Sequence, residues 1–82
     1  MRVEVLYFAG ARDVAGKSKE SCELPASVPT VAAFLAWLVE RYPALEPYAS
    51  SLRIAQNEMF VDGPELLSEN DTLAVIPPVA GG

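Results

Sequence analysis

Two stretches near the ends of the chain carry the side-chain pattern of β-strands. Residues 2–8 are rich in β-branched and aromatic side chains, which favour extended backbone. Every second residue of this stretch is apolar, so one face of the strand is expected in the core: Val3, Val5 and Tyr7. Residues 72–76 form the last predicted strand, with Leu73 and Val75 expected to point into the same core.

A helical pattern occupies the middle of the chain. Its apolar residues recur at the spacing i, i+3, i+4, i+7, i+8 and i+11, at positions 31, 34, 35, 38, 39 and 42. This spacing places all of them on one face of a helix that starts at Val31 and is stopped by Pro43. Thr30 stands where the N-cap of that helix would be.

The remaining segments carry weaker signals. Strands are predicted at residues 19–24, 52–56 and 59–61, the first of them at a sheet edge because most of its residues are polar. Residues 45–50 favour a short second helix. Residues 9–16 contain two glycines and are expected to form a connection with about one helical turn.

The resulting order of elements, β-β-α-β-β-β, predicts an α+β fold. A hairpin, a crossing helix and further strands place one main helix across one face of a mixed sheet. The helical crossover makes the outer segments of the chain parallel neighbours at the sheet centre. This is the β-grasp arrangement of ubiquitin. We expect residues 1–76 to form the domain and residues 77–82 to form an extended, flexible tail.

Composition excludes several classes of function. A chain of 82 residues allows one domain, and a hydrophobic content of 51% excludes intrinsic disorder. One cysteine and no histidine argue against a disulfide scaffold, a zinc site and histidine-dependent catalysis, so we expect no bound metal or cofactor. A net charge of -5 disfavours nucleic acid as a partner. Without a long apolar run or a leader pattern, we expect a cytoplasmic protein with no membrane partner.

The body of the domain shows no catalytic constellation. The carboxylates are scattered singly, as is typical of a solvated surface. Cys22 lies between Ser21 and Glu23 with no cation near it in sequence to activate the thiol, so we interpret it as a small buried apolar residue.

The end of the sequence has a different character. Pro77 and Pro78 lack backbone N–H donors, so they should end the sheet and direct the following residues away from it. Val79 and Ala80 are small, and the final pair, Gly81-Gly82, has no side chains. Such a tail could thread a narrow channel in a partner and present its terminal carboxylate, although small residues are also common at frayed chain ends.

An apolar surface is expected at the root of this tail. If Leu73 and Val75 face the core, Ile76 lies on the outer face of the last strand. Leu6 and Phe8 would continue that face on the neighbouring first strand, and Phe60 could join them. An exposed patch of this kind is typical of a docking surface. The alternative is that a loop covers these residues or that the strand parity is inverted.

The chain resembles the MoaD family, the small subunits of molybdopterin synthase. The resemblance runs through its whole length and rests on four elements, quoted from this sequence: Val5-Leu6-Tyr7-Phe8-Ala9, Arg12-Asp13 with Gly16, Asn57-Glu58, and Ala74-Val75-Ile76-Pro77-Pro78-Val79-Ala80-Gly81-Gly82. The Pro-Pro-Val-x-Gly-Gly ending is the most specific of these elements.

The resemblance implies a ubiquitin-like sulfur carrier. An adenylating enzyme (MoeB-like) would activate Gly82 with ATP, and a sulfur donor protein would convert it to a thiocarboxylate. The tail would then insert into a large subunit (MoaE-like) of a heterotetramer and give sulfur to cyclic pyranopterin monophosphate. Gly82 and Gly81 would be the reacting end. Residues at partner-contacting positions of the family are Phe8, Arg12, Phe60, Ile76, Pro77, Pro78, Val79 and Ala80, of which Arg12 would form an ion pair with the adenylating enzyme.

Two positions depart from the family pattern. Asn70-Asp71 stands where the family has Gly-Asp, and Gln56-Asn57 stands where Val-Asn is usual. Asparagine tolerates left-handed backbone angles better than other residues with side chains, so we expect the first turn to be kept.

Three alternatives remain open at the level of sequence. The first is the sulfur carrier of thiazole synthesis (ThiS), which shares the fold, the ending and the activation chemistry. The second is a ubiquitin-related protein modifier that is joined to lysines. The third is an interaction module with an inert tail.

Overall fold

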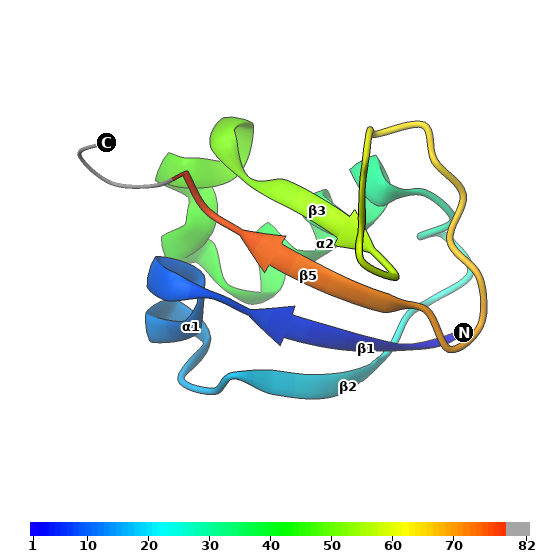
Figure 1. Cartoon of the computed structure of the whole chain (residues 1–82), viewed down its shortest axis with the longest axis horizontal. Helices are drawn as coiled ribbons and strands as arrows, with labels where there is room; N and C mark the ends of the chain where they lie inside the picture. Colours follow the sequence, from blue (N-terminus) through cyan, green and yellow to red (C-terminus); the bar gives the residue numbers. More distant parts are fainter. Residues whose placement is uncertain (79–82) are drawn as a thin grey trace.

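Five strands form one mixed sheet in the computed structural model, which describes residues 1–78 (Figure 1). The spatial order of the strands is β2-β1-β5-β3-β4. The elements follow the chain as β1 (Arg2–Tyr7), α1 (Ala9–Ala15), β2 (Lys19–Glu23), α2 (Val31–Arg41), the 3₁₀ helix η1 (Pro43–Ser51), β3 (Arg53–Gln56), β4 (Met59–Val61) and β5 (Thr72–Ile76).

The first and last strands lie side by side at the centre of the sheet. β1 and β5 pair in parallel, with Val5 opposite Leu73 and Tyr7 opposite Val75. Residues directly opposite in a sheet share a face, and these four are almost completely buried. β2 and β3 pair antiparallel on either side of this central pair, so β2 is an edge strand. The predicted β-grasp topology is confirmed.

Helix α2 covers one face of the sheet (Figure 1). It begins where the sequence predicts, because the hydroxyl of Thr30 accepts a hydrogen bond of 3.2 Å from the backbone N–H of Ala33. Its buried side chains lie at the predicted spacing: Val31, Phe34 and Leu38. None of the helices formed by residues 1–78 is long and apolar enough to cross a membrane.

The connection after β1 is more regular than the sequence indicates. Residues Ala9–Ala15 form a seven-residue helix, nearly two turns rather than about one. Gly16 ends it with a left-handed φ of 75°, and its N–H donates to the carbonyl of Arg12 at 2.8 Å. The prediction was too short because Ala11 alone is buried in this helix, so no apolar stripe marks it.

Left-handed backbone angles occur in two tight turns. Asn70, before β5, has a φ of 69°, which confirms that asparagine keeps the turn where glycine is usual in the family. The turn between β3 and β4 consists of Asn57 and Glu58, with φ values of 50° and 73°. Both turns lie at the end of the sheet opposite to the end of β5 (Figure 1).

Candidate functional site

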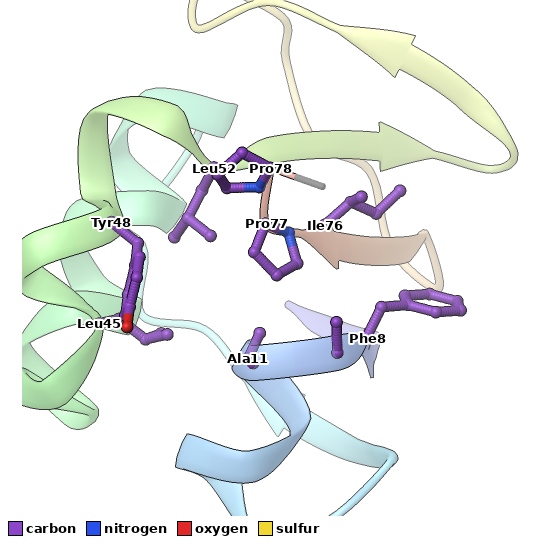
Figure 2. Close-up of a pocket in the computed structure, with 10 residues that line it drawn as sticks. Phe8, Ala11, Leu45, Tyr48, Leu52, Ile76, Pro77 and Pro78 are labelled. Atoms are coloured by element: carbon purple, nitrogen blue, oxygen red, sulfur yellow. The ribbon is translucent and has the colours of Figure 1, made fainter. Parts of the chain in front are cut away.

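Residues 76–78, which we call the tail root, lie between two apolar surfaces. β5 ends at Ile76, and β1 continues beside it, because the N–H of Phe8 donates to the carbonyl of Val75 at 3.3 Å. The side chains of Phe8 and Ile76 point to the same side (Figure 2). Phe8 is 47% exposed and Ile76 is half-buried, whereas Val75 is fully buried. The predicted parity of the two strands is therefore confirmed.

An apolar row crosses the outer face of the sheet. Phe60 on β4 is opposite Ala55 on β3, which is opposite Ala74 on β5, which is opposite Leu6 on β1. Cross-strand neighbours share a face, so this row and the pair at the tail root form one surface. We call it the sheet patch, and its members are Leu6, Phe8, Ala55, Phe60, Ala74 and Ile76. Phe60 is 56% exposed, so no loop of residues 1–78 covers it.

A pocket of about 500 Å³ lies on the other side of the tail root (Figure 2). It opens between the start of α1, the helix η1 and the two prolines. Its lining is almost entirely apolar: Phe8, Ala9, Gly10, Ala11, Leu45, Tyr48, Leu52, Ile76, Pro77 and Pro78. A partner that contacts both the sheet patch and this pocket can therefore exclude water from both sides of the tail root.

The structure brings together four of the six predicted site residues that it describes. Phe8, Ile76, Pro77 and Pro78 meet at one end of the molecule (Figure 2). Phe60 lies on the same face as Phe8, on the edge strand β4. Arg12 is exposed on α1, which follows the carboxyl end of β1. The predicted residues Val79, Ala80, Gly81 and Gly82 lie outside the described part of the chain.

Sequence reasoning missed the far wall of the pocket and one cation. Leu45, Tyr48 and Leu52 of that wall follow a helical spacing of i, i+3 and i+7, a signal that was present in the sequence. Arg53 was interpreted only as part of a strand. In the structure its guanidinium carbon lies 4.2 Å from the centroid of the Phe60 ring, over the sheet patch.

A polar cluster around Glu20 lies beneath the edge strand β2. The hydroxyls of Tyr7 and Tyr42 donate to its carboxylate at 3.2 and 3.0 Å, and Arg41 and Lys17 form ion pairs with it at 3.3 and 3.4 Å. Burial alone would raise the pKa of Glu20. The Tyr42 hydrogen bond and the two cations outweigh burial and hold this pKa below its ordinary value.

The same cluster makes the single cysteine unreactive. Cys22 is buried, as predicted, and its thiol lies 3.6 Å from the Glu20 carboxylate. Burial first, and then the negative charge of Glu20, raise the pKa of Cys22 to about 11. A thiol that remains protonated at neutral pH is a poor nucleophile, so Cys22 is not the group that carries chemistry.

A second buried carboxylate, Asp71, closes the opposite end of the sheet. It accepts hydrogen bonds from the side-chain amides of Gln56 and Asn57 at 2.7 and 2.9 Å, and from the N–H of Ser68 at 2.7 Å. These donors overcome the effect of burial and lower the pKa of Asp71. The cluster ties the turn before β5 to the turn after β3. Among residues 1–78, no group of three or more acidic or cysteine side chains is arranged to hold a metal ion.

The fold and the exposed patch define a ubiquitin-like protein of the β-grasp class. The chain superposes on an archaeal ubiquitin from Caldiarchaeum subterraneum with a TM-score of 0.64 over 100% of this chain and 98% of that one, at 18% identity, which shows the fold alone. It superposes on SAMP1, a small archaeal modifier protein from Haloferax volcanii, with a TM-score of 0.83 and 28% identity over the whole of both chains.

Sequence relatives narrow this class to one family. The ThiS family profile matches residues 5–82. A molybdopterin synthase sulfur carrier subunit from Chlamydomonas reinhardtii is 36% identical over 100% of both chains, and one from Drosophila yakuba is 35% identical over 100% of this chain and 92% of the relative. A Pyrococcus furiosus protein assigned as molybdopterin converting factor subunit 1 is 30% identical, with a TM-score of 0.82 over 96% of this chain and 99% of that one. The chain therefore belongs to the ThiS family of ubiquitin-like proteins and is homologous to its molybdopterin synthase sulfur carrier subunits.

Proposed function

We propose that this chain is the sulfur-carrier subunit of a molybdopterin synthase and acts in molybdenum cofactor biosynthesis. The observation that carries the proposal is the 36% identity with a subunit of that name over the full length of both chains. The sheet patch supports it, because a carrier must be held by enzymes that perform chemistry on its terminus. In this proposal the chain carries the sulfur and its partners supply the catalytic groups.

In the proposed reaction the terminal carboxylate of Gly82 is the reacting group. It attacks ATP on an adenylating enzyme, and pyrophosphate leaves. Sulfur at the oxidation level of sulfide, supplied by a donor protein, then displaces AMP and leaves a thiocarboxylate. In the large subunit this sulfur is transferred to cyclic pyranopterin monophosphate, and two such transfers supply the two sulfurs of molybdopterin.

The residues of the tail would have distinct roles in this cycle. Gly81 and Gly82 have no Cβ, so the activated carbonyl can be approached closely from either side. Val79 and Ala80 would fit a narrow channel, and Pro77 and Pro78 would aim them into it. The partners would be held by Phe8, Phe60, Ile76 and Arg12. We place the cycle in the cytoplasm, where ATP is available to the adenylating enzyme.

A protein modifier is the second candidate, and the likeness to the archaeal modifier SAMP1 favours it. Both functions begin with adenylation of a terminal glycine. They differ in the acceptor, since a modifier is joined to lysines of other proteins through an isopeptide bond. The thiazole carrier differs only in the enzyme that consumes the sulfur, and the names of the full-length relatives favour molybdopterin synthesis.

One experiment separates these functions. The purified chain is incubated with ATP, an adenylating enzyme and a sulfur donor, and its intact mass is measured. A carrier gains the mass of one oxygen-to-sulfur exchange, and the product then forms molybdopterin with a large subunit but no thiazole with a thiazole synthase. Covalent ladders with other proteins would favour the modifier. An unchanged mass with a competent enzyme would contradict both.

Deletion of Gly82 tests the proposed reacting group. We expect the variant to keep the melting temperature of the parent chain, because within residues 1–78 the buried core residues all precede position 76. It should show no mass gain and support no molybdopterin synthesis. A variant without Gly82 that still supported synthesis would overturn the mechanism.

A further inference from the structure

The basic residues are concentrated at one end of the molecule. Because β2 and β3 run antiparallel to β1 and β5, their first residues lie at the end where the C-terminal segment leaves the sheet. Five of the six basic residues lie at this end: Arg12, Lys17, Lys19, Arg41 and Arg53. Five acidic residues lie at the other end, in the turn after β3, in the loop before β5 or at the end of β2 (Figure 1): Glu23, Glu58, Glu65, Glu69 and Asp71. Four acidic residues share the end with the basic ones: Asp13, Glu20, Glu40 and Glu46.

Three of the basic side chains have no carboxylate within ion-pairing distance among residues 1–78. Arg2, Lys17 and Arg41 each lie within 4.0 Å of an acidic side chain. In the part of the chain that the structure describes, no such contact is made by Arg12, Lys19 and Arg53, and all three lie at the tail-root end.

One of these three cations borders the sheet patch, and a second lies within it. Lys19 is opposite Leu6, and Arg53 is opposite Ile76, so both share the outer face with the apolar row. Arg53 lies over the Phe60 ring at 4.2 Å, which holds the guanidinium against the patch. The patch is therefore an apolar surface with Lys19 at its β2 edge and Arg53 between Ile76 and Phe60.

The unpaired guanidinium defines the chemistry of the partner. A protein that covers Phe8, Phe60 and Ile76 must also take Arg53 out of water, because Arg53 lies between two of them. Removing an unpaired charge from water is costly, and a carboxylate that accepts two guanidinium hydrogen bonds offsets that cost. A lysine at position 53 would supply the same positive charge, but not the planar guanidinium that can donate two hydrogen bonds to one carboxylate.

We infer that the adenylating enzyme presents an apolar face bordered by carboxylates to the sheet patch, and that Arg53 pairs with one of them while Lys19 lies against another. This inference rests on the proposed function. Complementary charges on two partners raise their association rate more than their affinity. The adenylating enzyme acts on the free chain at the start of each proposed cycle, so fast association serves it directly. It also allows a chain with a net charge of -5 to approach an acidic surface with its tail first.

The test measures association of the full chain with its adenylating enzyme by stopped-flow fluorescence. Between about 0.1 M and about 1 M salt the Debye length falls from about 10 to about 3 Å, and the association rate constant should fall about tenfold. Arg53→Gln should lower the rate constant at low salt about threefold to tenfold and flatten its salt dependence. Arg53→Lys should keep most of the rate but shorten the lifetime of the complex.

Arg2→Gln is the matched control. It removes the same charge at the opposite end of the molecule, where Arg2 lies 4.0 Å from Glu23, and it should leave the rate constant unchanged. Equal effects of Arg2→Gln and Arg53→Gln would overturn the inference, because net charge alone would then account for them. An association rate that rises with salt, or an Arg53 dependence found only with the large subunit, would also overturn it.

The mass measurement separates this inference from the proposed function. If the parent chain gains sulfur while Arg53→Gln binds the enzyme as fast as the parent, the carrier function stands and the inference about the partner surface fails. If the parent chain neither binds nor is modified by a competent enzyme, both fail. Circular dichroism melting of each variant, expected to match the parent, excludes a folding defect as the cause of a lower rate.

Discussion

At the scale of single residues, Glu20 and Asp71 accept the most hydrogen bonds of the acidic side chains in residues 1–78. No sequence pattern distinguishes them from the other carboxylates. Glu20 is surrounded by two tyrosines and two cations that come from four different positions along the chain. Asp71 accepts hydrogen bonds from the side-chain amides of Gln56, the last residue of β3, and of Asn57 in the turn that follows. Carboxylates that are scattered in sequence are usually solvated, so both were grouped with the surface. Only their spatial neighbours make them structural.

Replacing Glu20 with glutamine should weaken the fold in a pH-dependent way. The pKa of Glu20 is lowered in the folded state, so its contribution to stability is fully present above its unfolded value, ordinarily about 4.5. That contribution is lost as the pH falls from there through the folded value. At neutral pH we expect Glu20→Gln to lower the free energy of unfolding by about 1–3 kcal/mol, measured by urea denaturation. The difference from the parent should shrink as the pH falls below 4.5.

The control for this prediction is Glu40→Gln, at an exposed position on α2 that forms no ion pair within residues 1–78. It should leave both the stability and its pH dependence nearly unchanged. Asp71, whose pKa is also lowered, is present in all three proteins and therefore drops out of the comparison. A Glu20→Gln chain with a constant deficit from pH 7 to the acid limit would show that the carboxylate charge is not what stabilises the cluster.

At the scale of elements, local signals decided the strands, α2 and the presence of a short helix at residues 45–50, and tertiary contacts decided the lengths of α1 and η1. The strand at Thr72–Ile76, the brief strand at Met59–Val61 and the N-cap at Thr30 lie where the sequence predicts them. Each carries its signal in its own residues. Helix α1 has one buried residue and η1 contains an internal proline, so neither has a periodic pattern strong enough to fix its length.

Replacing Glu58 with glycine should stabilise the β3–β4 turn. Glu58 has a left-handed φ of 73°, which is strained for a residue with a Cβ and free of that strain for glycine. We expect Glu58→Gly to raise the free energy of unfolding by about 0.5–1 kcal/mol in chemical denaturation. Glu65→Gly, at an exposed position whose φ is not in the left-handed region, should instead lower it. If both glycine variants were destabilised equally, the backbone angle would not be what limits this turn.

At the scale of the whole molecule, the fold brings the tail root, an apolar patch and most of the basic side chains to one end. The parallel pairing of β1 with β5 makes Phe8 and Ile76 neighbours although 67 residues separate them along the chain. The antiparallel placement of β3 then adds Arg53 and, through β4, Phe60. Every partner that reaches the C-terminal segment meets this combined surface.

Placing a charge on the sheet patch should separate binding from folding. Phe8 is 47% exposed, so Phe8→Glu should cost less than about 1 kcal/mol in stability and weaken binding to the adenylating enzyme and to the large subunit at least about tenfold by calorimetry. Leu66→Glu is the control, since Leu66 is an exposed apolar residue in the loop at the opposite end. It should change neither quantity. Unfolding of the Phe8→Glu chain would show that Phe8 belongs to the core.

The sequence by itself determined the fold class, the strand parity and the candidate residues at the tail root. These follow from the period of the side chains along the backbone and from the stereochemistry of proline and glycine, which are properties of neighbouring residues. The tertiary structure decided which distant residues meet: the pocket wall of η1, the burial of Glu20 and Asp71, and the position of Arg53 over Phe60. Such contacts depend on strand order and register, and packing across the whole sheet fixes these, because only one register buries every apolar face at once.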